Sequence, residues 1–475
     1  MTQLSRHPVA DPPTAPEREK TGHLLLRAYA VLVVFSALAH SFWYNLAGMA
    51  GAAVLLGALT LATLAIWLPR LRRSRRTTPF AWRRLPWLGL AYVAFALLSL
   101  LWSAWPAATA VTWLLLASAT LQGLFLADAL TWRELVRCLE ISLRWVLGLS
   151  LLLELWVAGI RRRPLLPNFS DAPADPDPHW YWVRGNLLDS VLDPGRVQGI
   201  VGNANLLGIL CLLALIVFGI RLADRAPSPA VRIVWIAVAA FLLLRSGSVT
   251  TLVALVAVAG VLCAALLIRR AALPRGRTPL YAVFAGVAVV GIVSAVLLRE
   301  RLLALVGREG DLTGRGDIWQ AVLERASTRP VAGNGFASPW LPWDPAFDGW
   351  ILDHGITVFH AHDMWLDVYL QLGAIGVALV AGVFAALTWR AWFFAVDRPR
   401  WDIRADRPYQ AITLLPILVV AMLLVQGLTE SGPIMLWGWM LVTLLAFKIK
   451  SVPLIDVGVA EASAPERRPL RVRRG

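Results

Sequence analysis

Twelve apolar runs, separated by short polar segments, constrain the fold of this 475-residue chain more than any other feature. A helix needs roughly 20 apolar residues to cross about 30 Å of hydrocarbon, and most of the runs approach that length. Charged residues form only 16% of the chain. We therefore expect an all-α integral membrane protein with about 12 transmembrane helices. The predicted spans cover residues 24–42, 46–68, 85–102, 108–130, 141–160, 200–220, 231–244, 249–268, 279–298, 365–389, 409–428 and 434–448.

The positive charge of the chain is distributed unevenly between the predicted connections. With the N-terminus placed inside, the inward segments and the inner ends of the adjoining spans hold 33 of the 45 Lys and Arg residues, and such an excess marks the cytoplasmic side. The sequence therefore predicts two cytoplasmic termini, with a disordered segment at 1–20, a membrane domain at 21–450 and a disordered basic tail at 451–475. Because the basic residues are spread over many loops, the net charge of +15 indicates contact with membrane lipids and no nucleic acid partner.

Two long segments between the spans are predicted on the outer face. The first long loop, residues 161–199, contains Asp-Pro turns and several aromatic residues. The second long loop, residues 299–364, is expected to contain short helices and is too long to be a simple connection. Function is expected in these loops. The inward loops contain no Gly-rich phosphate-binding sequence, so the energy for any reaction must come with the substrate.

Arg315 lies at the start of a short amphipathic helix that is predicted within the second long loop. Ile318 and Trp319 begin the apolar face of this helix, which is expected to lie at the membrane surface. The N-terminus of a helix favours an anion over a cation. The position of Arg315 is therefore explained either by a bound anion or by an ion pair with Asp311 or Asp317.

A pair of histidines, His360 and His362, precedes the tenth predicted span. In an extended segment the two side chains point the same way and could ligate a metal together. A zinc site usually has three or four protein ligands, and the sequence shows no obvious third ligand. General-base chemistry by an imidazole is the other functional interpretation, and a simple pair of interfacial histidines is the structural one.

Further polar residues lie where the first long loop enters the sixth predicted span. Arg196 stands at the outer end of that span, and Asn203 and Asn205 fall inside it, where polar residues are candidates for function. Arg245 marks an outward turn between the seventh and eighth spans. Together with Arg315, these arginines could converge on one polyanion. A diphosphate is the natural candidate because the guanidinium fork matches phosphate oxygens.

Four sequence stretches together resemble the O-antigen ligase and O-antigen polymerase superfamily. GRGDIWQAVLERASTRPVAGNGF (314–336) is similar to its GRxxxW, helix and PxxGxGF pattern, and HAHDMWLDVYLQLGAIG (360–376) to its HNxxL and GxxG pattern. RVQGIVGNAN (196–205) resembles the RxxGxxxNxN stretch, and SGSVTTLVA (246–254) the SxSRTxxLA stretch. Two positions depart from the family pattern: Val249 replaces an Arg, and Asp363 replaces an Asn.

The resemblance implies a glycosyltransferase of the bacterial inner (cytoplasmic) membrane, with its active site on the outer, periplasmic face. Such an O-antigen ligase-like enzyme takes a glycan from undecaprenyl diphosphate and transfers it to a hydroxyl of a surface acceptor such as lipid A-core, in lipopolysaccharide biosynthesis. Inversion at the anomeric carbon, no metal and no cofactor are implied. The expected partners are the polyprenyl-diphosphate-linked donor, the lipid-anchored glycan acceptor and membrane lipids.

The same resemblance suggests roles for individual residues. His362 is the expected general base, and Arg196 and Arg315 are expected to stabilise charge on the departing diphosphate. The remaining expected substrate-binding residues are Asn203, Asn205, Arg245, Trp319, His360 and Glu430, the last of which matches a frequent acidic position of the family.

Three other functions compete with this interpretation. An O-antigen polymerase would use the same donor and motifs, with a different acceptor. A metal-dependent membrane glycosyltransferase could use Asp175 and Asp177 with His179, although such acidic motifs usually occupy the first outer loop. A polysaccharide flippase or exporter would place polar residues at the midplane of several spans and show internal repeats.

Ligation is expected ahead of polymerisation because the large loop between the ninth and tenth spans matches the ligase layout. Trp340, Trp343 and Trp350 of that loop could provide stacking surfaces for acceptor sugars. Anchoring at the membrane interface is the alternative role for these tryptophans.

Overall fold

A computed structural model of the protein describes residues 21–74, 82–168, 172–189, 195–271, 274–298, 315–397 and 410–451. The predicted disordered segment 1–20 and, apart from Ser451, the predicted tail 451–475 lie outside the described residues. So do residues 299–314, and with them Asp311.

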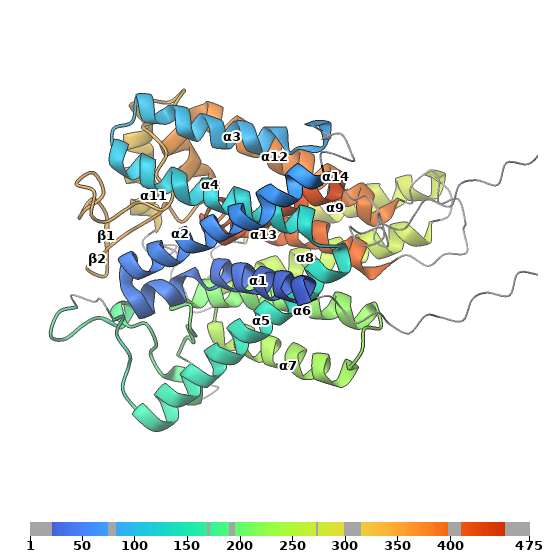
Figure 1. Cartoon of the computed structure of the whole chain (residues 1–475), viewed down its shortest axis with the longest axis horizontal. Helices are drawn as coiled ribbons and strands as arrows, with labels where there is room; N and C mark the ends of the chain where they lie inside the picture. The colour runs from blue at the N-terminus through green and yellow to red at the C-terminus, as the bar shows by residue number, and fades with distance from the viewer. Residues whose placement is uncertain are drawn as a thin grey trace, which may run out of the picture.

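The expected all-α architecture is confirmed. Within the described residues, each of the twelve predicted spans lies mainly on one α-helix, and a further helix, α11, lies in the second long loop (Figure 1). The α-helices are α1 (Thr21–Leu38), α2 (His40–Ser74), α3 (Trp87–Leu98), α4 (Pro106–Ala129), α5 (Trp132–Leu155), α6 (Ala204–Ala223), α7 (Pro229–Ser246), α8 (Val249–Arg270), α9 (Pro274–Leu297), α11 (Arg315–Ser327), α12 (Met364–Val396), α13 (Leu415–Gln426) and α14 (Leu436–Ser451). Short helical turns lie at Trp82–Arg84, Ser99–Leu101, Trp156–Arg161, Pro178–Trp180, Asn186–Leu188, Ala411–Leu414 and Gly432–Ile434.

Seven of these helices are long and apolar enough to cross a membrane, as judged by length and composition among the described residues. They are α2, α4, α5, α6, α7, α8 and α12. The shorter apolar helices include α1, α3 and α13. The only strands in the described part of the chain are β1 (Leu352–Asp353) and β2 (Ile356–Thr357), which pair antiparallel as a small hairpin in the second long loop.

The helices lie side by side along the long axis of the molecule, and both long loops lie at the same end of this bundle (Figure 1). Helix α4 packs on α14, α6 on α7, α8 on α13 and α1 on α5. Segments far apart in the sequence are thereby neighbours, and the two loops meet over one end of the core.

Side-chain caps fix where several helices begin at the loop end. Asn203 caps α6 by accepting a hydrogen bond from the amide of Leu206 at 3.0 Å, and Asp363 caps α12 through the amides of Trp365 and Leu366. The predicted sixth span began at residue 200, so the expectation that Asn203 lies inside it was wrong. The side chain of Asn203 satisfies an otherwise unpaired helical amide, and α6 therefore begins directly after it.

The second long loop has an apolar core of its own. The expected amphipathic helix forms as α11, and the side chains of Ile318 and Val322 on its apolar face are 4% and 0% exposed. Trp340 stacks on Phe347 within the same cluster, with ring centroids 5.8 Å apart. Most of the apolar face of α11 is therefore covered by the loop itself, while Leu323 is 45% exposed, and the position of α11 at the membrane surface stays a prediction.

Helix α12 is interrupted at Gly373, whose backbone angles of φ 60° and ψ −161° are not helical. The interruption frees the carbonyl groups of Leu370 and Gln371 from their partners one turn later. The loop supplies substitutes, because the amides of Asn334 and Gly335 donate to these carbonyls at 3.0 and 2.9 Å. Unpaired buried backbone groups are costly, so this exchange stabilises the break.

The amide side of the same break is satisfied in the same way. The amide of Ala374 donates to the carbonyl of Pro330 at 2.9 Å, and the amide of Ile375 to that of Val331 at 3.2 Å. Residues 330–335 therefore act as a backbone splint across the break in α12. The splint follows α11 directly, so it fixes α11 against α12.

Glycine is required on both sides of this contact. A Cβ atom on Gly333, whose φ is +72°, would lie 2.3 Å from the carbonyl carbon of Gln371. A Cβ atom on Gly373 would lie 2.4 Å from the carbonyl carbon of Val331. Both positions combine a left-handed φ with backbone contact that cannot move aside.

We predict that Gly333→Ala and Gly373→Ala each lower the free energy of unfolding by at least about 1–3 kcal/mol, the usual cost of such backbone strain. The measurement is denaturant unfolding of purified protein in detergent. Gly382→Ala in the same helix is the matched control, because its Cβ would meet only the side chain of Leu88 at an ordinary 3.5 Å. Equal stability of all three variants would refute the splint.

Candidate active site

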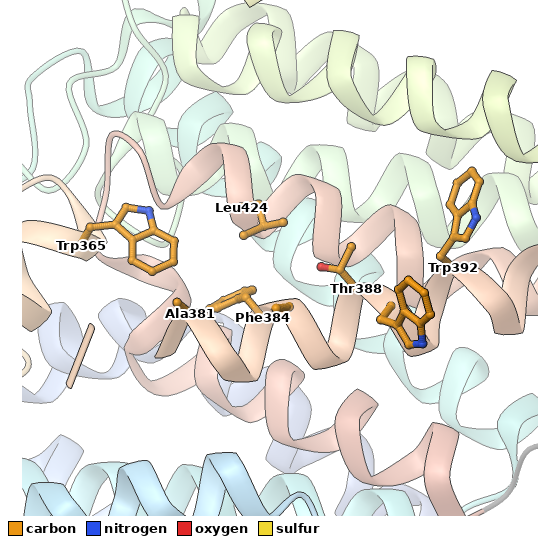
Figure 2. A pocket seen from close by; sticks show the side chains of 8 residues that line it. Trp365, Ala381, Phe384, Thr388, Trp392 and Leu424 are labelled. Carbon is orange, nitrogen blue, oxygen red and sulfur yellow. The ribbon is translucent and has the colours of Figure 1, made fainter. Parts of the chain in front are cut away.

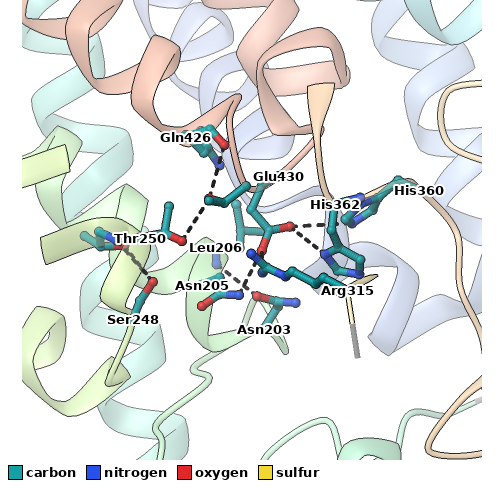
Figure 3. Close-up of polar contacts among 12 residues, drawn as sticks. Asn203, Asn205, Leu206, Ser248, Thr250, Arg315, His360, His362, Gln426 and Glu430 are labelled. Carbon is teal, nitrogen blue, oxygen red and sulfur yellow. Dashed lines mark hydrogen bonds and ion pairs between the residues drawn. The ribbon is translucent and has the colours of Figure 1, made fainter. Parts of the chain in front are cut away.

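A buried carboxylate, Glu430, occupies the centre of a polar network at the loop end of the bundle (Figure 3). It lies in the turn between α13 and α14, where its amide donates to the carbonyl of Gln426 at 2.8 Å. The same turn is tied to α8 by a 2.8 Å hydrogen bond between the hydroxyl groups of Thr429 and Thr250. The backbone therefore holds Glu430 in a fixed place, with 8% of the residue exposed.

Arg315 is the first residue of α11 and makes an ion pair with Glu430, with Nη2 and Oε1 3.0 Å apart. Both side chains are largely buried, at 12% and 11% exposure. Within the described residues the carboxylate partner of Arg315 is thus Glu430 and not Asp317 of the same helix. The positive end of the helix dipole disfavours an arginine at the first position of a helix. The carboxylate of Glu430 compensates this repulsion at Arg315.

His362 and His360 approach the other oxygen of Glu430. Nδ1 of His362 lies 3.1 Å from Oε2, and Nε2 of His360 lies 3.8 Å from it. The backbone of His362 is left-handed, with φ 51°, so the segment is not extended as expected. The turn brings the amide of His362 within 3.0 Å of Nδ1 of His360, which accepts its hydrogen bond.

Asn205 links the first long loop to this network. Its side-chain amide donates to Oε1 of Glu430 at 2.8 Å, and its oxygen accepts from Nη2 of Arg196 at 2.6 Å. The Nε group of Arg196 donates to the carbonyl of Ser246 at 2.9 Å. Arg196 is therefore one hydrogen-bonded residue away from Glu430, and its guanidinium is oriented from two sides.

Two predicted site residues lie outside the network. Arg245 is buried and donates through Nη2 to the carbonyl of Asn186 in the first long loop, so its charge is directed away from Glu430. Asn203 is exposed and serves as the cap of α6. Among the described residues, neither side chain makes a hydrogen bond or an ion pair with Glu430.

The tryptophans of the second long loop have varied surroundings. Trp319 donates from Nε1 to the carbonyl of Ala361 at 3.0 Å and thereby supports the segment that carries both histidines. Trp340 is 1% exposed and donates to Asp367 at 3.0 Å, so the expected role of Trp340 as a sugar-stacking surface was wrong. The guanidinium of Arg325 lies 3.5 Å from the ring centroid of Trp350, and Trp343 is 48% exposed.

The charges around Glu430 set its protonation. Burial raises the pKa of this carboxyl group, but the hydrogen bond with His362, the charge of that imidazole when protonated and the charge of Arg315 outweigh burial and lower the pKa to about 2. Burial lowers the pKa of His360 to about 3, and His362 and Arg315 act in the same direction. Near pH 7, Glu430 is therefore ionised and His360 is neutral.

His362 has the geometry of a general base. Its Nδ1 faces the Glu430 carboxylate, and among the described residues its Nε2 has no protein partner. Its side chain is 23% exposed, against 7% for His360. A carboxylate on one ring nitrogen orients the imidazole and stabilises its protonated form, while the other nitrogen takes a proton from a substrate.

A metal-ligand set is also present at this place. His360, His362 and Glu430 offer one ligand atom each, all within 4.8 Å of one another. Glu430 is thus the third possible ligand that the sequence pattern did not reveal. Arg315 already forms an ion pair with the same carboxylate. Its positive charge would repel a metal ion bound there.

An apolar pocket of about 430 Å³ lies along α12 and α13, close to the histidines (Figure 2). Trp365, three residues after His362, lines one end, and Trp392 lines the other. Between them the lining includes Phe384 and Leu424. The lining of this pocket is almost entirely apolar, and such a surface can accommodate a hydrocarbon chain.

Part of the chain is similar to a known protein family. Residues 233–381 match the O-antigen ligase family model, so the match includes Arg245, Arg315, His360 and His362. The matched segment is 149 of the 475 residues, so the likeness to this family is established for that part of the chain. Arg196, Asn205 and Glu430 lie outside the matched segment, although the first two of them connect to Glu430 through hydrogen bonds.

One curated relative is similar to part of the chain. The exopolysaccharide production protein ExoQ of Rhizobium meliloti (strain 1021) is 30% identical over 156 residues, which is 30% of this chain. The aligned part covers about a third of the length of ExoQ, at 34%.

Sequence reasoning missed some of the residues that build the site. Thr250 and Thr429 fix the turn that carries Glu430, and Asp363 caps the helix that follows His362. Thr250 lies within the stretch 246–254 that carried the family resemblance, so a signal for it was present. The pairing with Thr429, 179 residues away, is a property of the fold alone.

The lowered pKa of His360 predicts a specific pH dependence of stability. Unfolded histidine takes up a proton near pH 6.5 and folded His360 only near 3, so its contribution is complete above 6.5 and is lost as the pH falls toward 3. Relative to His360→Asn, wild-type protein should lose up to about 1.4 kcal/mol of unfolding free energy per pH unit below 6.5. Denaturant titrations at pH 7.0 and 5.5 measure this difference.

His354→Asn is the control, because the side chain of His354 is 45% exposed. Its stability should follow the wild-type curve over the same interval. Parallel wild-type and His360→Asn curves would contradict a buried, neutral His360.

Proposed function

We propose that the protein is a glycosyltransferase that moves a glycan from undecaprenyl diphosphate to a hydroxyl of a surface acceptor such as lipid A-core. The observation that carries the proposal is the convergence of Arg315, His362 and Asn205 on the buried carboxylate Glu430. This arrangement combines an oriented base with fixed positive charge. Those are the two requirements of a reaction in which a hydroxyl is activated and an anionic group leaves.

The proposed reaction is a single displacement. The acceptor oxygen attacks the anomeric carbon as its proton passes to Nε2 of His362, and the bond between that carbon and the diphosphate oxygen breaks. The diphosphate leaves with the bonding electrons, so the anomeric configuration inverts. Glu430 stabilises the protonated imidazole, and His360 is proposed to position His362 through its backbone amide.

The proposed diphosphate contacts are the guanidinium groups of Arg315 and Arg196, which match phosphate oxygens in shape and charge. Glu430 and Asn205 orient them before the donor binds. Arg245 is not proposed as a direct contact because its side chain is directed to Asn186. Asn203 and Trp319 are proposed to support the site through α6 and through Ala361.

The proposed membrane arrangement has 12 spans in a domain at 21–450, cytoplasmic termini and an active site on the outer face of the bacterial inner membrane, formed by the two long loops. The distribution of Lys and Arg supports this orientation. The apolar pocket that begins at Trp365 is proposed to receive part of the polyprenyl chain of the donor (Figure 2).

Ligation of a finished glycan remains the first proposal for the acceptor step. Polymerisation is the second, and the role named for the relative ExoQ, exopolysaccharide production, favours it. Both reactions use the same donor chemistry and the same residues.

We predict that His362→Ala lowers the transfer rate about 10²–10⁴-fold, because it removes the proton acceptor. Arg315→Lys and Arg196→Lys keep the charge but lose the planar fork. Each should lower the rate roughly ten- to a hundredfold, equivalent to about 1.5–3 kcal/mol. The measurement is transfer from a synthetic polyprenyl-diphosphate glycan by purified protein.

Arg329→Lys and His354→Ala are the matched controls and should keep the wild-type rate. Arg329 directly precedes the splint and is exposed, and its guanidinium donates to the carbonyl of Trp102. A folded His362→Ala protein with full activity would remove His362 from the mechanism.

Transfer is proposed to need no metal, because Arg315 already neutralises the carboxylate that would be the third ligand. Excess EDTA should therefore leave the transfer rate unchanged. Loss of activity that Mn²⁺ or Mg²⁺ restores would instead support a metal-dependent transferase that uses His360, His362 and Glu430.

Deletion of the gene tests the acceptor. If the protein is a ligase, full-length glycan should remain on its polyprenyl carrier, and the acceptor should appear bare on a gel of surface glycans. An acceptor capped with one repeat unit would support the polymerase. Accumulation of glycan on the cytoplasmic side would support a flippase and contradict both enzymes.

A further inference from the structure

A second cluster of metal-ligating side chains lies outside the proposed active site. Asp177 and His179 come from the first long loop, at its short helical turn Pro178–Trp180, and His354 comes from the turn between β1 and β2. One ligand atom of each lies within 4.8 Å of the other two. The rings of His179 and His354 stack with centroids 3.8 Å apart and an angle of 27° between their planes.

Each imidazole in this cluster is oriented by a carboxylate. Nδ1 of His179 lies 2.6 Å from Oδ1 of Asp177, which also accepts the amide of His179 at 2.8 Å. Nδ1 of His354 lies 2.8 Å from Oδ1 of Asp353. Both Nε2 atoms are left without a recorded protein partner among the described residues. Asp353 thus supports His354 in the way usual for a histidine ligand, by holding one ring nitrogen while the other can bind a metal. Asp177 and Nδ1 of His179 face each other, so both can contribute a ligand atom to the same ion.

The turn that carries His354 has an unusual backbone conformation. His354 has a left-handed φ of 50°, and the following Gly355 has φ 74°. Non-glycine residues rarely adopt this conformation. The turn holds the ring of His354 against His179 although 175 positions separate the two residues in the sequence.

We propose that Asp177, His179 and His354 form a binding site for a divalent transition ion of the Zn²⁺ class, which joins the two long loops. Two imidazoles and a carboxylate are a ligand set that Zn²⁺ accepts, with water in the fourth position. The three side chains are 39–46% exposed, so an ion reaches them directly from solution. Arg184 is the charged neighbour that acts on Asp177, and Asp353 adds a second negative charge beside His354.

This site goes beyond the proposed glycosyl transfer and contains none of its residues. A bound ion would close a loop of about 175 residues between the two segments, and a link between distant segments restricts the unfolded chain. The expected effect is mechanical: the ion holds the first long loop against the β1–β2 hairpin.

The test is Zn²⁺ binding to chelator-treated, full-length protein in detergent, measured by isothermal titration calorimetry. We expect one ion per chain and a higher midpoint of thermal unfolding with Zn²⁺ present. His179→Ala and His354→Ala should each weaken binding by at least about tenfold, the smallest effect that loss of an outer-shell partner usually has. Both substitutions should also abolish the thermal shift.

Two controls separate this site from the other possibilities. Asp175→Ala removes an exposed acidic side chain from the same loop but not from the cluster, and His362→Ala removes the other histidine set. Both should bind Zn²⁺ as the wild type does. Absence of binding to the wild type, or binding that is lost in His362→Ala but kept in His179→Ala and His354→Ala, would overturn the proposal. Because these readouts need no glycan donor, they are independent of the transfer assays.

Discussion

The break in α12 is the constraint on which the rest of the loop end depends. At Gly373 the helix gives up its own hydrogen bonds, and residues 330–335 take them over on both sides of the break. A helix that crosses a membrane cannot leave such groups unpaired, because lipid offers no substitute partner. The splint and the break therefore require each other. Together they determine where α11 ends, and thus where Arg315 at its start faces Glu430.

The buried carboxylate of Glu430 is the second feature on which the loop end depends. A buried carboxylate is unfavourable unless charge and hydrogen bonds compensate it. Here Arg315, Asn205 and His362 contribute that compensation from three separate parts of the chain. The carboxylate also orients each of these partners. Loss of one partner therefore leaves the negative charge of Glu430 buried and only partly compensated. The site and the local stability of the loop end are therefore the same set of interactions.

The helices could be predicted from the sequence because an apolar run of membrane-spanning length is a local property of about 20 residues. The family resemblance pointed to Arg315, His362 and Glu430, which do meet in the fold. The environment of Trp340 could not be predicted in the same way, because its burial depends on Phe347 and Asp367 packing around it. The direction of the Arg245 side chain and the start of α6 after Asn203 could not be predicted either. Both depend on hydrogen-bond partners and not on the periodicity of the sequence.

The place of Glu430 in the chain has a consequence for biosynthesis. Asn205 and Glu430 are 225 residues apart, and the turn that carries Glu430 follows α13. Until the ribosome has delivered that turn, the arginines at positions 196 and 315 have no shared counter-charge, and the histidine segment has no carboxylate to orient it. A chain interrupted before α13 would carry every basic component of the centre but could not assemble it. Completion of this polar network is thereby coupled to synthesis of α13 and of the turn that follows it.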